Sequence, residues 1–127
     1  MIQLLPAVRV PRLITVAILL LALCACATAP AKNVPLVIGQ QAALEGEVLQ
    51  VDTAPWAYDG NAVVTILTSA GRVGVQLPAR WNLCKAPPLG DVQGLMAGDR
   101  VQVIGTVTAA GEVVVCGQPH HRLSKAQ

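Results

Sequence analysis

The residues best suited to chemistry lie near the C-terminus, in the run Cys116-Gly-Gln-Pro-His120-His121. Thiolate, imidazole and thioether groups bind zinc or copper, and Cys84 and Met96 could complete such a set. Neighbouring side chains on an extended chain point in opposite directions, however, so His120 and His121 are poorly placed to share one ion. A disulfide between Cys84 and Cys116 accounts for both cysteines without an ion. We favour the disulfide and expect no metal and no cofactor.

A second group of residues is suited to binding rather than to bond chemistry. Trp56 and Tyr58 lie in the segment 53–60, and Trp81 directly follows Arg80. Exposed aromatic rings stack on bases or sugars. The chain has no Phe, one Tyr and two Trp, so the two tryptophans could instead close the ends of the core as its largest side chains. We slightly favour that core role, and keep all four residues as candidate ligand-binding residues.

The sequence argues against catalysis. It contains no Gly-x-Ser-x-Gly, no His-Glu-x-x-His and no glycine-rich phosphate loop. Beyond the N-terminal leader, the serines are Ser69, in an expected hairpin loop, and Ser124, in an expected tail. Glu45 and Glu47 share one face of an expected strand, where such pairs are usually solvated. We therefore expect a protein that is not an enzyme.

The elements that must position these residues have the pattern of β-strands. Alternating or β-branched residues predict five strands, over residues 44–51, 62–68, 72–77, 100–107 and 112–116. Gly46 predicts a bulge or sharp bend in the first strand. Gly71 and Gly111 each end a short loop between valine-rich runs, which predicts two hairpins because glycine readily adopts positive φ.

A long connection separates the third and fourth predicted strands, over residues 78–99. Pro87 and Pro88 exclude a long helix there. Residues 91–97 could form one or two turns, capped by Asp91 at the start and Gly98 at the end.

Five strands, a glycine in the first and a long insertion after the third resemble the OB-fold barrel over residues 44–123. Leu44-Glu-Gly-Glu-Val48 is similar to the bending first strand of such barrels, and residues 95–107 are similar to an insertion that leads into strand four. The chain resembles small secreted bacterial OB-fold proteins, which are described as ligand-binding or stress-related domains. A five- or six-stranded barrel of another topology is the alternative.

The resemblance implies an all-β fold: a small five-stranded OB-like Greek-key barrel over residues 41–127, with a polar C-terminal tail. It also implies a ligand face made of the loop after strand one, the surface of strands two and three, and the loop after strand four. Trp56 and Tyr58 would lie in the first of these loops.

The N-terminal residues predict export. Arg9 and Arg12 come just before an uncharged apolar run of about 13 residues. Such a run is short for a membrane span and typical of a signal peptide. Leu23-Cys24-Ala25-Cys26 resembles the bacterial lipobox, which implies cleavage before Cys26 and diacylation of its thiol. The segments would then be a signal peptide over residues 1–25 and a lipid-anchored tether over 26–40. An ordinary secreted protein and an uncut N-terminal anchor are the alternatives.

The net charge of the chain after Cys26 disfavours nucleic acid as a partner, and the predicted compartment favours a disulfide. The formal charge of +2 comes from Arg9 and Arg12, because seven Lys and Arg balance seven Asp and Glu from Cys26 onward. A neutral domain has little electrostatic attraction for nucleic acid. An oxidising compartment would favour the Cys84–Cys116 disulfide.

The sequence thus predicts a membrane-tethered, non-enzymatic module of the cell envelope that binds a protein partner or an envelope component. Ala27 after Cys26 favours the outer membrane, facing the periplasm, by resemblance to lipobox proteins. A soluble periplasmic or secreted protein is the alternative location. Binding of single-stranded nucleic acid or oligosaccharide is the alternative function, followed by binding of a metal.

Overall fold

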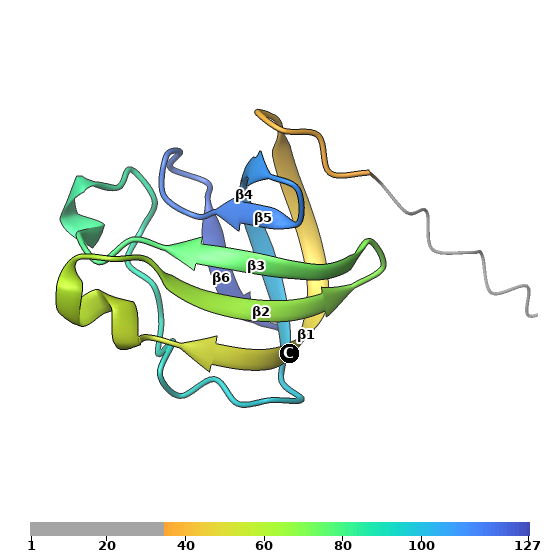
Figure 1. Cartoon of the computed structure of the whole chain (residues 1–127), viewed down its shortest axis with the longest axis horizontal. Helices are drawn as coiled ribbons and strands as arrows, with labels where there is room; N and C mark the ends of the chain where they lie inside the picture. The colour runs from red at the N-terminus through yellow and green to blue at the C-terminus, as the bar shows by residue number, and fades with distance from the viewer. Residues whose placement is uncertain (1–34) are drawn as a thin grey trace, which may run out of the picture. The chain divides into compact units, whose positions relative to one another are not determined.

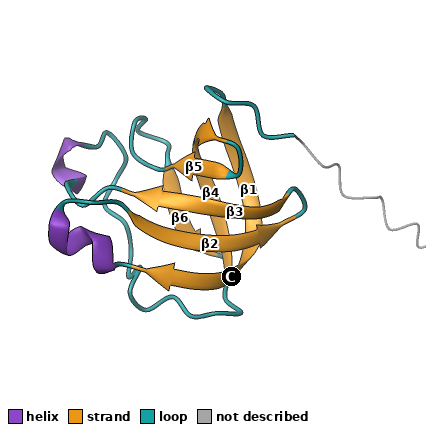
Figure 2. Ribbon diagram, viewed as in Figure 1, coloured by secondary structure: helices purple, strands orange, loops and turns teal. Residues whose placement is uncertain are grey.

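The computed structural model describes residues 35–127; the predicted signal peptide, Cys26 and most of the predicted tether lie outside the described residues. The described part is all-β, with two short 3-10 helices at one end (Figures 1 and 2). Its strands are β1 (Gln41–Asp52), β2 (Ala62–Thr68), β3 (Gly71–Leu77), β4 (Arg100–Ala109), β5 (Glu112–Val114) and β6 (Arg122–Lys125). The 3-10 helices are η1 (Ala54–Tyr58) and η2 (Trp81–Leu83).

Five of the strands close into a barrel. They pair in the order β1-β2-β3-β5-β4, and β4 pairs again with β1. The β3–β5 pairing is parallel, whereas the pairings of β1 with β2, β2 with β3, β4 with β5 and β1 with β4 are antiparallel. This closed barrel confirms the predicted OB-like fold, and β6 adds a sixth strand to β4.

The first strand serves two neighbours because it bends. It pairs with β4 up to Glu47 and with β2 from Glu47 onward, and its register shifts between Val48 and Gln50. A Cβ atom added to Gly46 would lie 2.7 Å from the carbonyl oxygen of Leu67, so a larger residue would block this approach of the two backbones. The predicted bend is confirmed, and Figure 1 shows the two arms of β1 meeting at a steep angle.

The two predicted glycine hairpins are also confirmed. Gly71 and Gly111 have φ of 98° and 67°, in the left-handed region that favours glycine. The first turn is further held by Thr68, whose hydroxyl accepts a hydrogen bond from the amide of Ala70 at 3.0 Å.

The core is built almost entirely from aliphatic side chains that alternate along the strands. Ile66 and Leu77 are the largest apolar side chains that are fully enclosed. The other members are mainly valines: Val48, Val64, Val73, Val75, Val92, Val101, Val103, Val107, Val113 and Val115, with Ala42, Ala62 and Leu123. Trp56 and Trp81 pack against the outside of this cluster and are only partly buried. They therefore close the edge of the core and do not fill its centre.

One local prediction was wrong. Residues 122–125 form β6 and not a polar tail, because Leu123 packs into the core and the backbone pairs with β4. The expected turns over residues 91–97 are present, with both expected capping residues in place. The Asp91 carboxylate accepts the amide hydrogen of Gly94 at 2.8 Å, and Gly98 has φ of 95°.

Candidate binding site

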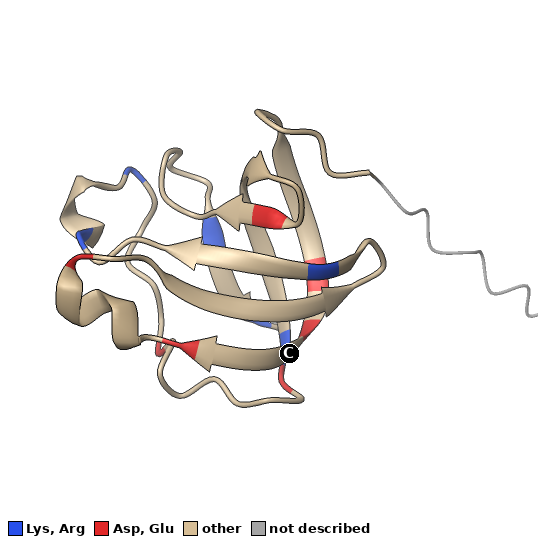
Figure 3. Cartoon of the chain, viewed as in Figure 1, with Lys and Arg blue, Asp and Glu red and all other residues tan. Residues whose placement is uncertain are grey.

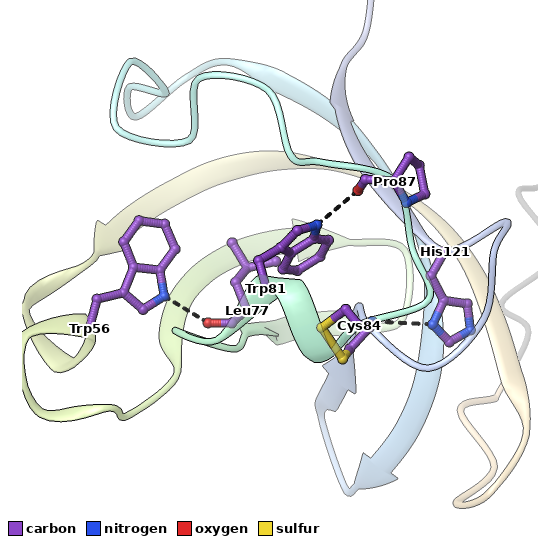
Figure 4. Close-up of a disulfide and its surroundings, with 7 residues drawn as sticks. Trp56, Leu77, Trp81, Cys84, Pro87 and His121 are labelled. Carbon is purple, nitrogen blue, oxygen red and sulfur yellow. Dashed lines mark hydrogen bonds between the residues drawn. A yellow bond between two sulfur atoms is a disulfide. The ribbon is translucent and has the colours of Figure 1, made fainter.

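The loop between β1 and β2 fixes the position of Trp56. Pro55 lies at the start of η1, and the amide of Trp56 donates to the carbonyl of Thr53 at 3.1 Å. The loop closes where Gly60 donates to the carbonyl of Pro55 at 2.9 Å. The indole Nε1 of Trp56 then donates to the carbonyl of Leu77, at the end of β3, at 2.9 Å (Figure 4). The ring is therefore attached to the barrel and does not move freely with the loop.

A second indole is anchored in the same way. Trp81 begins η2, shortly after β3, and its Nε1 donates to the carbonyl of Pro87 at 3.1 Å (Figure 4). Each indole N–H is therefore bonded to a carbonyl of the chain itself. A ligand would meet the apolar rings and would not find a free indole donor.

The disulfide predicted from the sequence holds the insertion in place. The sulfur atoms of Cys84 and Cys116 are 2.09 Å apart, and their Cα atoms are 4.7 Å apart. The amides of Lys85 and Ala86 both donate to the carbonyl of Cys116 at 3.0 Å. One covalent bond and two hydrogen bonds thus attach the chain after η2 to Cys116, two residues beyond the end of β5.

This pairing removes the two thiolate ligands of the alternative metal site. Both thiols are bonded to each other, and the Met96 side chain is exposed. Among residues 35–127, no three His, Cys, Asp or Glu side chains come together as a metal-binding group.

A groove lies between the two tryptophans. Its volume is about 480 Å³, within the range of small-ligand sites. It is lined by Trp56, by Pro78 and Ala79 after β3, by Trp81, and by Pro88, Leu89, Gly90, Asp91, Val92 and Gln93 of the insertion. We call it the tryptophan groove. Its walls are mainly apolar, with Asp91 and Gln93 as the polar side chains.

The other two predicted ligand-binding residues lie beside this groove. Tyr58 is 88% exposed and is not among the lining residues. Arg80 donates to the carboxylate of Asp59 at 2.8 Å, and both side chains are exposed. Arg80 therefore links the loop after β1 to the insertion. Of the four candidates, the structure brings Trp56 and Trp81 together in one groove.

The groove differs from the ligand face that the resemblance implies. The loop after β4 is a tight turn at Ala110 and Gly111, with no large side chain to offer a ligand. The insertion supplies the second wall instead, through residues that sequence reasoning missed, such as Leu89 and Val92. The buried Val92 lies in a segment with no regular period, so only its isolated apolar character could have indicated contact with the core.

Sequence reasoning also missed the role of His121. Its side chain is 1% exposed, next to the disulfide (Figure 4). Its Nδ1 accepts the amide hydrogen of Cys116 at 3.3 Å, and its Nε2 lies 3.5 Å from the hydroxyl of Thr106. Burial, and secondly the nearby charge of His120, lower the pKa of His121. The alternation of buried His121 and Leu123 with exposed Arg122 and Ser124 is the signal that could have revealed both this residue and β6.

Charges on the described domain are dispersed. Residues 35–127 carry six Lys and Arg and seven Asp and Glu, and Figure 3 shows the two signs scattered over the barrel. Within this part of the chain, no helix has the length and hydropathy required to cross a membrane. Comparison with known protein families, curated proteins and solved structures finds no significant match to the chain.

Proposed function

We propose that this protein is a non-enzymatic binding module of the bacterial cell envelope, anchored to the membrane through a lipid on Cys26. It binds a protein partner or an envelope component in the tryptophan groove. The observation that carries the proposal is the pair of anchored indole rings, Trp56 and Trp81, lining one groove of about 480 Å³.

The anchoring of the rings favours binding. Each indole is held by a hydrogen bond to a backbone carbonyl, and the disulfide fixes the insertion that forms the opposite wall. Side chains that are already ordered lose little conformational entropy when a partner binds. Aromatic rings fixed in a groove are also typical anchor points of protein interfaces.

A protein partner fits the lining better than a sugar does. Asp91 and Gln93 are the polar side chains of the groove, and the Asp91 carboxylate already accepts the Gly94 amide hydrogen. A sugar requires several well-placed polar groups, whereas an apolar side chain requires mainly the indole rings and the prolines. An oligosaccharide stacked on the two rings is the second candidate, and the dispersed charge disfavours nucleic acid.

Site-specific crosslinking in intact envelopes tests the proposal. A photoreactive amino acid replaces Gln93, on the groove wall, in the full chain, and a matched protein carries it at Gln50, on an exposed part of β1. We expect a protein adduct from position 93 alone, and we expect Trp81→Ala to abolish it. The same adducts from both positions, or none from position 93, would contradict binding in the groove. Protection by soluble cell-wall glycans would favour the oligosaccharide.

A further inference from the structure

Strand β6 has one free edge. It pairs with β4 from Val101↔Lys125 to Ile104↔Arg122, and the amide of Ala126 donates to the carbonyl of Arg100 at 2.8 Å. In an antiparallel pair, hydrogen-bonded and non-hydrogen-bonded positions alternate. Arg122 and Ser124 therefore direct their backbone groups toward β4. Leu123 and Lys125 direct theirs away from it.

The outward backbone groups border an open cleft. Among residues 35–127, the amides and carbonyls of Leu123 and Lys125 make no backbone hydrogen bond to another segment. A cleft of about 500 Å³ lies beside them. Strand β6 forms one wall, and the insertion forms the other, with lining residues that include Pro88, Asp91, Val92 and Leu95. We call it the β6 cleft. It is separated from the tryptophan groove by the segment around Asp91 and Val92, which lines both.

We propose that the β6 cleft binds an extended peptide segment of a partner protein, which adds to β6 as a further strand. The two outward residues, Leu123 and Lys125, are two positions apart and present the alternating donors and acceptors that an extended backbone matches. The peptide carries an acidic residue, because Arg122 and Lys125 on β6 give this wall a positive charge. Lys125 already pairs with Asp99 at 3.2 Å, so the acidic residue would pair with Arg122.

Lys125 argues against a second copy of this chain. Antiparallel pairing of two β6 strands centred on Ser124 would set Lys125 of each copy opposite Leu123 of the other, with the two Lys125 side chains diagonally adjacent on one face, and like charges so placed oppose the pairing. The proposal rests on the proposed role of the protein as a binding module. It concerns a different cleft from the tryptophan groove, however, so the two can fail separately.

Two substitutions of Lys125, compared with each other, isolate the free edge. Lys125→Pro removes the outward N–H, and proline is tolerated on an edge strand where its nitrogen faces away from the ladder. The matched control is Lys125→Ala, which loses the same ion pair with Asp99 but keeps the N–H. Melting temperatures of the two variants within a few degrees of each other would show that β6 still pairs with β4.

The probe is a displayed library of random linear peptides, selected on the full chain. We expect enriched peptides that contain an acidic residue and bind Lys125→Ala about as well as the parent protein, but Lys125→Pro about tenfold more weakly. N-methylation of the peptide amides one at a time should weaken binding at every second position, because alternate amides face β6.

Each other result would overturn the proposal. No enrichment, equal binding to the two Lys125 variants, or an N-methyl profile without alternation would exclude strand addition. A dimer of the full chain that disappears in Lys125→Pro would assign the edge to a second copy. Peptides that lose binding to Trp56→Ala but not to Lys125→Pro would lie in the tryptophan groove, which would support the proposed function and refute this inference.

Discussion

His121 is the one buried polar side chain in the core of the described domain, and its hydrogen bonds determine its protonation. Its Nδ1 accepts the Cys116 amide hydrogen, so the neutral ring carries its proton on Nε2, facing the Thr106 hydroxyl. Protonation would place a second N–H against the Cys116 amide and would put a charge in a buried site. The ring of His120 lies edge-on to it, with centroids 5.3 Å apart. The folded state therefore favours neutral His121.

Stability should decrease in mild acid because of this residue. The pKa of His121 is lowered in the folded protein from an ordinary value of 6.5, so the unfolded chain binds the proton more readily. Neutral His121 makes its full contribution to the free energy of unfolding above about pH 6.5. This contribution is lost as the pH falls from there toward the lowered pKa of His121 in the folded protein. Unfolding in denaturant at about pH 7.5 and about pH 5 measures this loss.

Variants of the two histidines identify the group responsible. His121→Leu should remove the pH dependence between those values, and should lower stability at about pH 7.5 by roughly 1–3 kcal/mol because the Cys116 amide loses its acceptor. His120→Gln, at an exposed position, should keep the dependence. The Asp99 pKa is lowered from 3.8 by the Met96 amide and Lys125, so its effect falls at more acidic pH. An unchanged pH dependence in His121→Leu would contradict this account.

The aromatic residues should separate into structural and dispensable ones. Trp56→Phe keeps a ring in the groove but loses the N–H bonded to the Leu77 carbonyl, so we expect a loss of about 1 kcal/mol. Tyr58→Ala, at a side chain that is 88% exposed, should change stability by less than about 0.5 kcal/mol. Denaturant unfolding of both variants checks this order. A larger loss for Tyr58→Ala would show that the exposed ring has a structural role.

At the scale of elements, the insertion between β3 and β4 forms the site without being a regular element itself. Its position depends on three attachments: the disulfide to Cys116, the two amides that donate to the carbonyl of Cys116, and the packing of Ala86 and Val92, each 6% exposed. The tryptophan groove and the β6 cleft lie on either side of it. Loss of any attachment should loosen both sites before it unfolds the barrel.

Removal of the disulfide should therefore affect binding more than the fold. The bond spans a sequence separation of 32, for which loop-closure entropy gives roughly 3.5–4 kcal/mol as an upper figure. A Cys84→Ala and Cys116→Ala double variant should melt at a lower temperature, keep its β-sheet circular dichroism and bind its partner more weakly. Thiol labelling of the exported protein, unfolded without reductant, should find neither cysteine free. Full labelling of both would show that the bond does not form in the cell.

The strands could be predicted from the sequence because burial alternates along them. Residues 62–68 were predicted with the bounds that β2 has, and Gly46, Gly71 and Gly111 marked the bend and the turns. Strand β6 has only four residues and three of them are polar, so the alternation that begins at His121 is a weak signal and the pairing with β4 depends mainly on a tertiary contact. Only part of the tryptophan groove could be predicted from the sequence. Trp56 and Trp81 stand out as candidate binding residues, but the opposite wall is irregular and its position depends on tertiary contacts.

At the scale of the whole molecule, export and lipid attachment stay predictions from the sequence, because Cys26 lies outside the described residues. Cys26→Ser should release the protein from membranes, whereas Cys24→Ser should leave it attached, because Leu23 directly before Cys24 makes that residue a poor lipobox cysteine. Intact mass of the membrane-extracted parent protein should show acyl groups on a chain that begins at Cys26. An unmodified chain beginning at Thr28 in the soluble periplasm would exclude the lipoprotein.

The pairing of β1 with β4 also determines when the protein can fold. Residue 41 pairs with residue 106, so the barrel cannot close until most of the chain is available. Such distant pairings slow folding, because the entropy of a long loop is lost before the contacts form. If the chain is exported N-terminus first, as the sequence predicts, the first arm of β1 would emerge with its partner still on the other side of the membrane. We expect the barrel to stay open until then, with its valine-rich strands accessible to periplasmic chaperones.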